Sequence, residues 1–423
     1  MAFIFGYARE LYGEAGAVVA LAVAALCPNL LAHGALVTPD IYLAAATVGF
    51  LWSIECLARR PSAAAAVTLG ICLGFSVAVK FTGILYVLLA PLLLRLAKPV
   101  APRRVFLRWL PAALLLAFLF IHAAYVFDGS FSRLGEFSFS SSLYQWLQAH
   151  LPGGFPTFFP RHFVRALDEQ LAERPYLAYL AGEFNRGGFL SYYAVAFFLR
   201  TPIAPLLLGG LATASQLRPA RKELPLLAFA LVLFVFFSLA RHKNIGLRYL
   251  LFLFPLLAVW CGRLSSVSGT IAGRIPRRGL AAGLWLLLLA SNLLAWPDYL
   301  AFFNSAAGGK EGGHRYLLDS NLDWGQGLIE LRDFLKEERI DKISLAYAGR
   351  VNPEFYGIRY DDLGGEPPTQ DVVAISANLL WGRMYFVNGK KFWPKSTETY
   401  ALYRSLEPWA ILGGSIYVYR RPR

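Results

Sequence analysis

A short basic segment, residues 241–249, holds the side chains best suited to chemistry in this chain. Arg241, His242, Lys243 and Arg248 lie there between two apolar runs. Arginine can hold a phosphate with paired donors, lysine supplies a mobile point charge, and histidine can add a hydrogen bond. The simpler reading is that these cations reach lipid headgroups, as they commonly do at the ends of membrane spans. The basic segment is therefore a candidate anion site. The choice between the two readings depends on which side of a membrane the segment occupies.

Other polar residues at the edges of apolar runs are weaker candidates. Asp40 opens an apolar run after Thr38-Pro39, where it can cap the first free amides of a helix or serve as a site carboxylate. Lys80 precedes a tight turn and can reach the same anion, although a lone lysine there also suits a headgroup contact. His33 fits a local hydrogen bond. Arg200 would lie deep in an apolar run, where a charge is costly unless it is paired, and the sequence identifies no partner for it.

The composition is that of a polytopic membrane protein. Hydrophobic residues make up 57% of the 423 residues, charged residues only 16%, and the mean hydropathy is +0.47. The formal net charge of +14 is explained by loop arginines, so nucleic acid is not an expected partner. The cysteines lack CxxC spacing and histidines do not cluster, so neither a disulfide framework nor a metal site is indicated, and no cofactor is predicted. The four cysteines are Cys27, Cys56, Cys72 and Cys261.

The apolar runs predict about nine membrane spans, with uncertain ends. Basic residues concentrate in alternate connections, which the positive-inside rule assigns to the cytoplasm. The other side then holds the turn at Lys80, the long loop 128–187, the basic segment and everything after residue 298. Three cations within eight residues on the outer face oppose the usual charge preference, which favours the anion-binding reading. The spans are expected near 13–31, 40–57, 63–79, 83–97, 107–127, 189–212, 224–240, 247–262 and 279–297.

A polar region, residues 299–423, follows the membrane domain 1–298 and is expected to form a small α/β domain outside the membrane. Strands are predicted at 342–347, 372–376 and 415–419. Asp323 and Gln326 have the spacing of a capping box before an amphipathic helix with Leu328, Leu331 and Leu335 on one face. That structural role is weighted above a direct part in chemistry. Trp324 between them is a candidate surface anchor or acceptor contact.

Three motifs resemble bacterial members of glycosyltransferase family 39, which includes protein O-mannosyltransferases and aminoarabinose transferases of lipid A. They are His33-Gly34-Ala35-Leu36-Val37-Thr38-Pro39-Asp40, the run from Phe237 through Arg248-Tyr249 to Phe254-Pro255, and Asp319-Ser320-Asn321-Leu322-Asp323-Trp324-Gly325-Gln326. The resemblance implies a GT-C fold in the bacterial inner membrane. It also implies transfer of a sugar from a polyprenyl-phosphate donor to a protein, lipid or polysaccharide acceptor on the outer side. In that frame Arg241, His242, Lys243, Arg248 and Lys80 would hold the donor phosphate, with Asp40 as a supporting carboxylate.

One feature departs from the family pattern. Members carry an acidic residue in the first outer loop, the usual candidate for the catalytic base, and no position here matches it. The start of this chain, from Met1 to Glu10, resembles the cytoplasmic end of an earlier span, so the expectation is that the first spans and their acidic loop are missing, without which the chain could be inactive. The simpler reading is a short interfacial leader on a complete protein. The alternative is a non-catalytic membrane protein that binds a lipid-linked sugar or organises an envelope complex. A transporter is less favoured, because the polar residues cluster at one face instead of the midplane. The sugar, the acceptor, metal dependence and the oligomeric state stay open.

Overall fold

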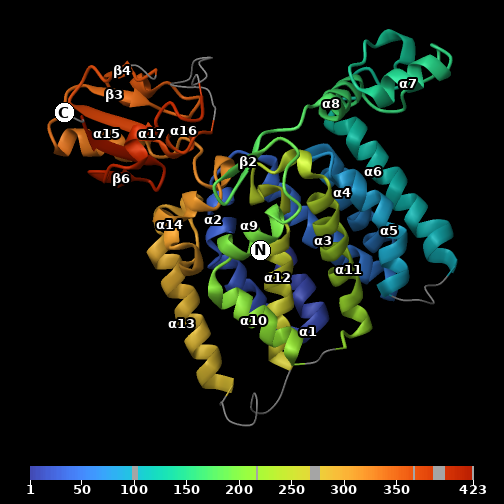
Figure 1. The fold of residues 1–423 in the computed structure, drawn as a ribbon. Coiled ribbons are helices and arrows are strands. Elements are labelled where there is room, and N and C mark those ends of the chain that lie inside the picture. The colour runs from blue at the N-terminus through green and yellow to red at the C-terminus, as the bar shows by residue number, and fades with distance from the viewer. Residues whose placement is uncertain (98–102, 216–217, 267–276, 365–366, 384–395, 422–423) are drawn as a thin grey trace.

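The computed structural model combines a large helical bundle with a small sheet domain (Figure 1). It describes residues 1–97, 103–215, 218–266, 277–364, 367–383 and 396–421, and the side chains of these residues except 242 and 277–282. The helices, in chain order, are α1 (Ala2–Ala25), α2 (Pro28–Gly34), α3 (Pro39–Arg59), α4 (Ala63–Val79), α5 (Gly83–Ala97), α6 (Leu110–Ala124), α7 (Ser142–His150), α8 (Arg161–Ala172), α9 (Tyr192–Arg200), α10 (Ile203–Ala214), α11 (Leu224–Leu239), α12 (Leu253–Cys261), α13 (Arg277–Ala295), α14 (Gly309–Gly312), α15 (Leu328–Glu337), α16 (Ala377–Leu380) and α17 (Ala401–Arg404).

Each predicted apolar run contains one or more of these helices, but two runs are bent. The sixth run breaks between α9 and α10, which meet at 108°, and the first breaks between α1 and α2 at 64°. Among the described residues, three helices are long and apolar enough to cross a membrane by themselves, and up to five are if each bent pair counts as one span. The helical membrane class is therefore confirmed, whereas the number of nine spans stays a prediction.

The first helix begins earlier than the first predicted span. It starts at Ala2 and contains a kink at Gly13, which has a φ of 75° and divides the helix into two parts. Glycine tolerates this left-handed conformation at no steric cost, whereas other residues adopt it rarely. The segment before residue 13 is thus helical in its own right and packs into the bundle through Ile4, Tyr7 and Leu11.

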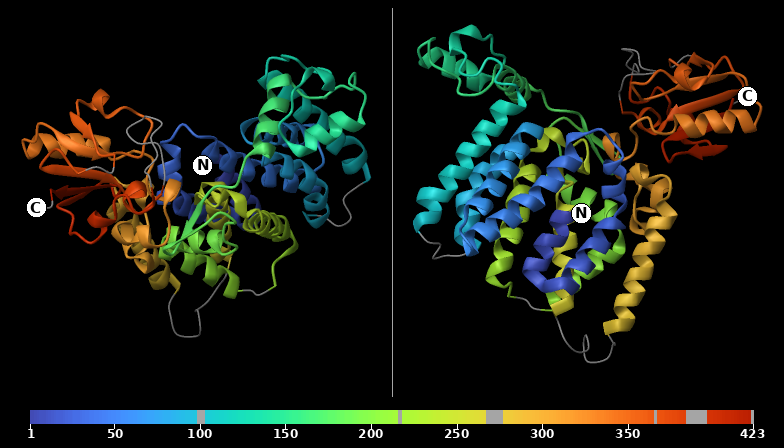
Figure 2. Two further views of the ribbon diagram at one scale, coloured as in Figure 1. Left: turned by 45° about the horizontal axis from the view of Figure 1, so that its top comes forward. Right: turned by 180° about the vertical axis from the view of Figure 1, so that it is seen from behind.

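The ends of the helical bundle differ in what they carry. Figure 1 and both views of Figure 2 show the sheet domain and the lobe of α7 and α8 at one end of the bundle, which we call the outer end. The ends of α5 and α12 and the start of α13 lie at the opposite, inner end. This arrangement agrees with the alternation of connections expected from the charge pattern. Which end faces the cytoplasm stays a prediction.

The sheet domain contains a mixed five-stranded sheet in the order β4-β3-β5-β7-β6. Strand β3 pairs in parallel with β4 and β5, while β7 pairs antiparallel with β5 and β6. The three predicted strands are confirmed as β3, β5 and β7; β4 and β6 are short and lack a clear alternating pattern. The strands are β3 (Ile343–Ala346), β4 (Tyr360–Asp362), β5 (Val372–Ser376), β6 (Ala410–Leu412) and β7 (Ile416–Arg420), and a separate hairpin of β1 (Ala178–Leu180) and β2 (Glu183–Asn185) lies in the outer loop.

The capping box predicted at Asp323 and Gln326 is wrong. Helix α15 begins at Leu328, and Gly325 has a φ of 82°, which interrupts any helix starting at residue 323. Asp323 Oδ1 accepts from the Gly325 amide at 2.8 Å, and Gln326 Oε1 accepts from the Trp324 amide at 2.7 Å. The two side chains therefore shape a turn before the helix. The predicted apolar face is confirmed, since Leu328, Leu331 and Leu335 are buried against the sheet.

The connection between the last long helix and the sheet packs on the bundle. Ala301, Phe303, Leu317 and Leu322 share one hydrophobic core with the helices, together with Ile375 of β5. A continuous core of this kind restrains the sheet domain relative to the helices. The outer ends of the helices are thus covered by residues that lie far away in the sequence.

Candidate functional site

A cluster of charges lies at the outer end of the bundle, where α3 begins and α4 ends. Asp40 is in the first turn of α3 and only 2% exposed. Its Oδ1 accepts from Lys80 Nζ at 2.5 Å, and its Oδ2 lies 3.8 Å from Arg248 Nη1. Three residues that are widely separated in the sequence therefore form one cluster of two cations and one carboxylate. We call it the Asp40 cluster.

The Asp40 cluster leaves hydrogen-bonding atoms unused. Asp40 Oδ2 and Arg248 Nε are buried atoms without a hydrogen-bond partner, and so are the nearby His33 Nδ1 and Thr38 Oγ1. A buried polar atom without a partner costs roughly 1–3 kcal/mol. Unused donors beside an excess of positive charge are suited to an anion. The cluster thus combines two cations and one carboxylate with buried polar atoms that no hydrogen bond satisfies.

Aromatic rings surround the cations of the Asp40 cluster. Lys80 Nζ lies 4.4 Å from the centre of the Tyr249 ring. The Arg248 guanidinium lies 5.3 Å from that ring and 5.0 Å from the Trp324 ring. Trp324 also meets His33 edge to face at 6.0 Å. Such cation–π contacts hold a cation in place without neutralising its charge.

The segment 319–326 fixes the backbone next to Arg248. Ser320 Oγ donates to the Ile245 carbonyl at 2.7 Å, and Asn321 Oδ1 accepts from the Leu247 amide at 2.9 Å. Between these bonds, a Cβ on Gly246 would lie 2.0 Å from Ser320 Oγ, so only glycine permits this approach. The motif around Arg248 and the motif 319–326 therefore meet in space, and Ser320 and Asn321 of the second hold the backbone of the first in position.

Lys243 belongs to the same region but has its own carboxylate partner. Its Nζ donates to Glu173 Oε2 at 2.6 Å, and Glu173 lies in the outer loop just after α8. Burial alone would raise the pKa of Glu173, but hydrogen bonds from Lys243 and Tyr176 outweigh it and lower that pKa. Burial lowers the pKa of Lys80, and the charges of Arg248 and Lys243 lower it further, against the opposing effect of Asp40. Lys243 thus contributes to the positive potential at the Asp40 cluster.

The remaining predicted residues are spread more widely. Arg241 is exposed at the start of a 3-10 turn, and the side chain of His242 lies outside the described part of the chain. Asp323 is buried and its pKa is raised to about 7, mainly by that burial. Trp324 is the member of its motif that contacts the cluster directly. Asp323 and Gln326 act on the turn that carries it.

Arg200 has the partner that the sequence did not reveal. It is 2% exposed and donates to Asn29 Oδ1 at 3.1 Å and to the Leu300 carbonyl at 3.1 Å. These bonds join α9, α2 and the segment after α13 at the bend of the sixth apolar run. A buried arginine here is thus stabilised by neutral oxygens and by the Phe303 ring, 5.1 Å away.

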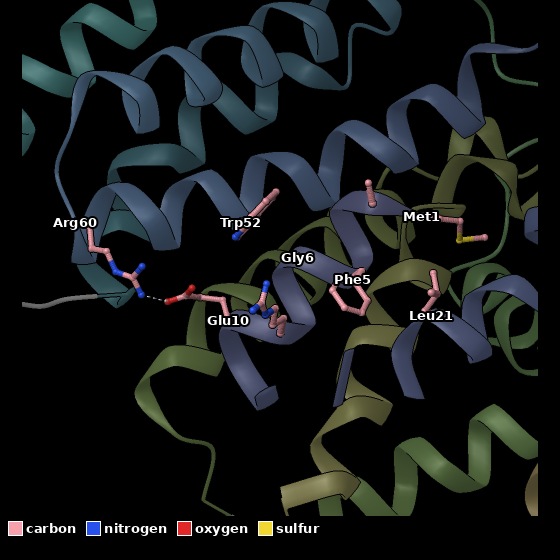
Figure 3. A pocket seen from close by; sticks show the side chains of 9 residues that line it. Met1, Phe5, Gly6, Glu10, Leu21, Trp52 and Arg60 are labelled. Atoms are coloured by element: carbon pink, nitrogen blue, oxygen red, sulfur yellow. Dashed lines mark hydrogen bonds and ion pairs between the residues drawn. The ribbon is translucent and has the colours of Figure 1, made fainter. Parts of the chain in front are cut away.

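A cavity at the first helix lies away from the Asp40 cluster. It measures about 850 Å³ and is lined by both parts of α1 and by α3. Figure 3 shows Glu10 and Arg60 paired at one end and Phe5, Trp52 and Met1 along its length. A smaller apolar cavity of about 250 Å³ lies next to the cluster, since its lining includes Gly34 and Ile41, the chain neighbours of His33 and Asp40. In the described residues, no three His, Cys, Asp or Glu side chains gather as metal ligands would.

Some residues of this region carry no signal in the sequence. Glu173 is one acidic residue among several in a long loop, and nothing in its surroundings distinguishes it. Ser320 and Asn321 act through bonds to a backbone about 75 residues away. Tyr249 directly follows Arg248. An aromatic residue next to a predicted site cation is a sequence signal by which its contact with the cluster could have been anticipated.

Residues 1–126 match the family model described as dolichyl-phosphate-mannose-protein mannosyltransferase. This segment includes Asp40 and Lys80, whereas Arg248 and the segment 319–326 lie beyond it. Neither the curated proteins nor the solved structures include a match to the chain. The family match confirms the resemblance to a glycosyltransferase of the GT-C type over these residues. Together with the apolar helices, it supports a multi-pass membrane glycosyltransferase.

Proposed function

We propose that this chain transfers a sugar from a polyprenyl-phosphate donor to an acceptor on the outer side of a bacterial inner membrane. In that reaction an acceptor hydroxyl oxygen bonds to the anomeric carbon while the bond from that carbon to the phosphate oxygen breaks. The electron pair leaves with the polyprenyl phosphate, and the hydroxyl proton passes to a base. The reaction therefore needs fixed cations where the phosphate charge develops.

The observation that carries the proposal is the excess positive charge of the Asp40 cluster. Lys80 and Arg248 share one carboxylate, and Arg248 Nε has no hydrogen-bond partner. A guanidinium held against two aromatic rings is preorganised, so little conformational freedom is lost when it binds a phosphate. Lys80 and Arg248 would hold the donor phosphate, and release of Lys243 from Glu173 would strengthen the contribution that Lys243 makes to the positive potential there.

The apolar cavity beside the cluster supports a lipid-linked donor. It is lined by Leu30, Ile41, Ala44, Val48 and Pro255 and lies among helices of the apolar bundle. A prenyl chain placed there would bury hydrocarbon surface while its phosphate remains near Lys80 and Arg248. A water-soluble sugar nucleotide would leave this cavity unused.

Asp40 is proposed as a supporting carboxylate. Its pairing with Lys80 orients the lysine amine, and its position in the first turn of α3 places it near the helix N-terminus. The resemblance implies a principal base in the first outer loop, and we expect no counterpart of it among residues 1–423. The alternative of a non-catalytic protein that binds a lipid-linked sugar therefore predicts donor binding without transfer.

A matched pair of lysine variants tests the proposal. Lys80 and Lys310 each donate to an aspartate at the outer end, at 2.5 Å from Asp40 and 2.6 Å from Asp298. With purified full-length chain, radiolabelled polyprenyl-phosphate mannose and membrane extract as acceptor, Lys80→Ala should lower transfer by roughly 100-fold. Lys310→Ala should leave transfer unchanged. Equal activity of both variants would contradict the assignment of the Asp40 cluster, and donor binding without transfer by the unmodified chain would favour the non-catalytic alternative.

A further inference from the structure

A second cavity lies at the outer end, between the β1–β2 hairpin and the sheet domain. It measures about 510 Å³. Its lining combines three aromatic residues, Tyr179, Phe184 and Trp381, with three charged ones, Arg315, Glu398 and Arg404. We call it the hairpin groove. None of these residues belongs to the Asp40 cluster, and the groove was not expected from the sequence.

The aromatic side of the hairpin groove is rigid. Trp381 stacks on His314, with ring centres 4.1 Å apart and an angle of 11° between the planes. Tyr179 packs against Phe184 at 5.0 Å and donates its hydroxyl hydrogen bond to the His314 carbonyl at 3.1 Å. Rings held by neighbours offer apolar surface at a low entropic cost to whatever binds them.

The charged side of the groove combines one ion pair with one further arginine, a net charge of +1. Arg404 Nη1 pairs with Glu398 Oε2 at 3.0 Å, while Arg315 is exposed. Burial lowers the pKa of His314 to about 4, so this ring adds no charge at neutral pH. The groove therefore offers a carboxylate acceptor and guanidinium donors side by side, with one positive charge, that of Arg315, left over.

These features select among ligand classes. A hydrocarbon chain would cover the Glu398–Arg404 pair without solvating it, which is unfavourable. An acidic peptide would find one unpaired cation, Arg315, but would leave the Glu398 carboxylate without a donor from the ligand and would not use the aromatic side. Sugar hydroxyls act as both donors and acceptors, and the carbon faces of a sugar ring can pack on aromatic side chains. We propose that the hairpin groove binds the saccharide part of the acceptor.

The groove is joined to the Asp40 cluster by a short chain of contacts. Trp381 is followed two residues later by Arg383, whose Nη2 donates to Asp319 Oδ2 at 2.7 Å. Asp319 begins the segment that holds the backbone beside Arg248 through Ser320 and Asn321. An acceptor bound in the groove would thus contact Trp381, two residues from the arginine that pairs with the segment beside the donor cations. This inference rests on the proposed function, since it specifies the acceptor class of that reaction.

The test measures saccharide binding without any donor. Full-length chain in detergent is titrated with neutral trisaccharides built of mannose, glucose or galactose, and binding is followed by saturation-transfer NMR and tryptophan fluorescence. At least one trisaccharide should bind, and Phe184→Ala and Arg315→Gln should each weaken it about tenfold or more. Two exposed residues outside the groove provide matched controls, and Phe355→Ala and Arg350→Gln should leave binding unchanged.

The outcomes separate this inference from the proposed function. Absence of binding by all three trisaccharides, or binding that Phe184→Ala and Arg315→Gln leave unchanged, overturns the groove assignment even if the chain transfers sugar. An acidic peptide of similar size that binds more tightly than every trisaccharide also overturns it. Saccharide binding that depends on the groove residues, in a chain that transfers no sugar, supports the groove and contradicts the proposed reaction.

Discussion

The two ends of the helical bundle both bury charged residues, but they do so differently. At the inner end, Arg263 and Glu223 are 4% and 3% exposed and pair at 3.1 Å. The other Glu223 oxygen accepts from the Ala220 amide, and Arg263 also donates to the carbonyls of Ala212 and Arg218. At the outer end, the Asp40 cluster has two cations for one carboxylate and keeps unused polar atoms.

The difference teaches how a structural ion pair and a binding site can be distinguished in one molecule. A buried pair offsets its desolvation only when hydrogen bonds satisfy the remaining donors and acceptors, as they do around Arg263. A cluster with leftover donors and uncompensated charge is poorer for stability and better for a ligand. The inner pair should therefore control stability and the outer cluster should control activity.

Breaking the inner pair should have the largest effect. Arg263→Ala leaves Glu223 as an unpaired buried carboxylate, and we expect a loss of about 3–5 kcal/mol in the free energy of unfolding. Denaturant unfolding in detergent, followed by tryptophan fluorescence, measures it. As a control, Arg60→Ala removes a partner of Glu10 that is 80% exposed, and it should cost no more than about 1 kcal/mol. A cost for Arg263→Ala as small as the control's would remove the basis of the comparison.

Arg248→Ala should reduce sugar transfer by roughly 100-fold while changing the unfolding free energy much less than Arg263→Ala does. The reason is that Arg248 is a donor to the anion and is not required to neutralise Asp40, which keeps its 2.5 Å contact with Lys80. Transfer per folded molecule and the unfolding free energy are measured on the same preparation. If the variant loses stability but keeps full transfer, Arg248 supports the fold and does not bind the donor.

The pH dependence of the unfolding free energy tests whether Asp323 affects stability and not sugar transfer. Burial raises its pKa from 3.8 to about 7. Between about pH 4 and 7 the unfolded chain loses this proton while the folded chain retains it. The free energy of unfolding therefore falls as pH rises, by up to about 1.4 kcal/mol per pH unit, and becomes constant above about pH 7. Asp323→Asn should flatten this slope and keep transfer. If the slope survives the substitution, Asp323 is not its source.

The smallest effect is expected at the outer loop. Glu173→Gln removes the carboxylate that pairs with Lys243 and frees that lysine for the donor phosphate. The KM for the polyprenyl-phosphate donor should fall about fivefold, with kcat little changed. The control is Glu183→Gln, an exposed carboxylate of β2 in the same loop. A higher KM in Glu173→Gln would show that Glu173 assists donor binding.

The membrane class and most helices could be predicted from the sequence, because long apolar runs have few alternatives in a bilayer. The bends were not predicted, although Pro28 and Pro202 mark both breaks locally, because the residue before a proline favours an extended backbone. The sequence did not show that Arg200, at the second break, bonds to Asn29 and Leu300. The helix start near Asp323 was misplaced for a related reason. Gly325 adopts a positive φ while packed against Tyr347, and its spacing from the capping residues gave no sign of that contact.

The candidate site was predicted as a set of residues but not as a geometry. Residue type and topology singled out Arg248, Lys80 and Asp40, which do meet, and Lys243, whose charge acts there. The sequence could not show that Glu173 pairs with Lys243, nor that Trp324 faces Arg248. Such contacts form between segments tens to hundreds of residues apart, so they depend on the packing of the whole bundle.

The bonds from Ser320 and Asn321 to the backbone at residues 245–247 also have a consequence for synthesis. The basic segment leaves the ribosome about 75 residues before Ser320 does. A nascent chain can therefore insert its apolar helices and still lack the support that fixes Arg248. A chain cut short before residue 320 would therefore contain the basic segment without the two side chains that hold the backbone beside Arg248.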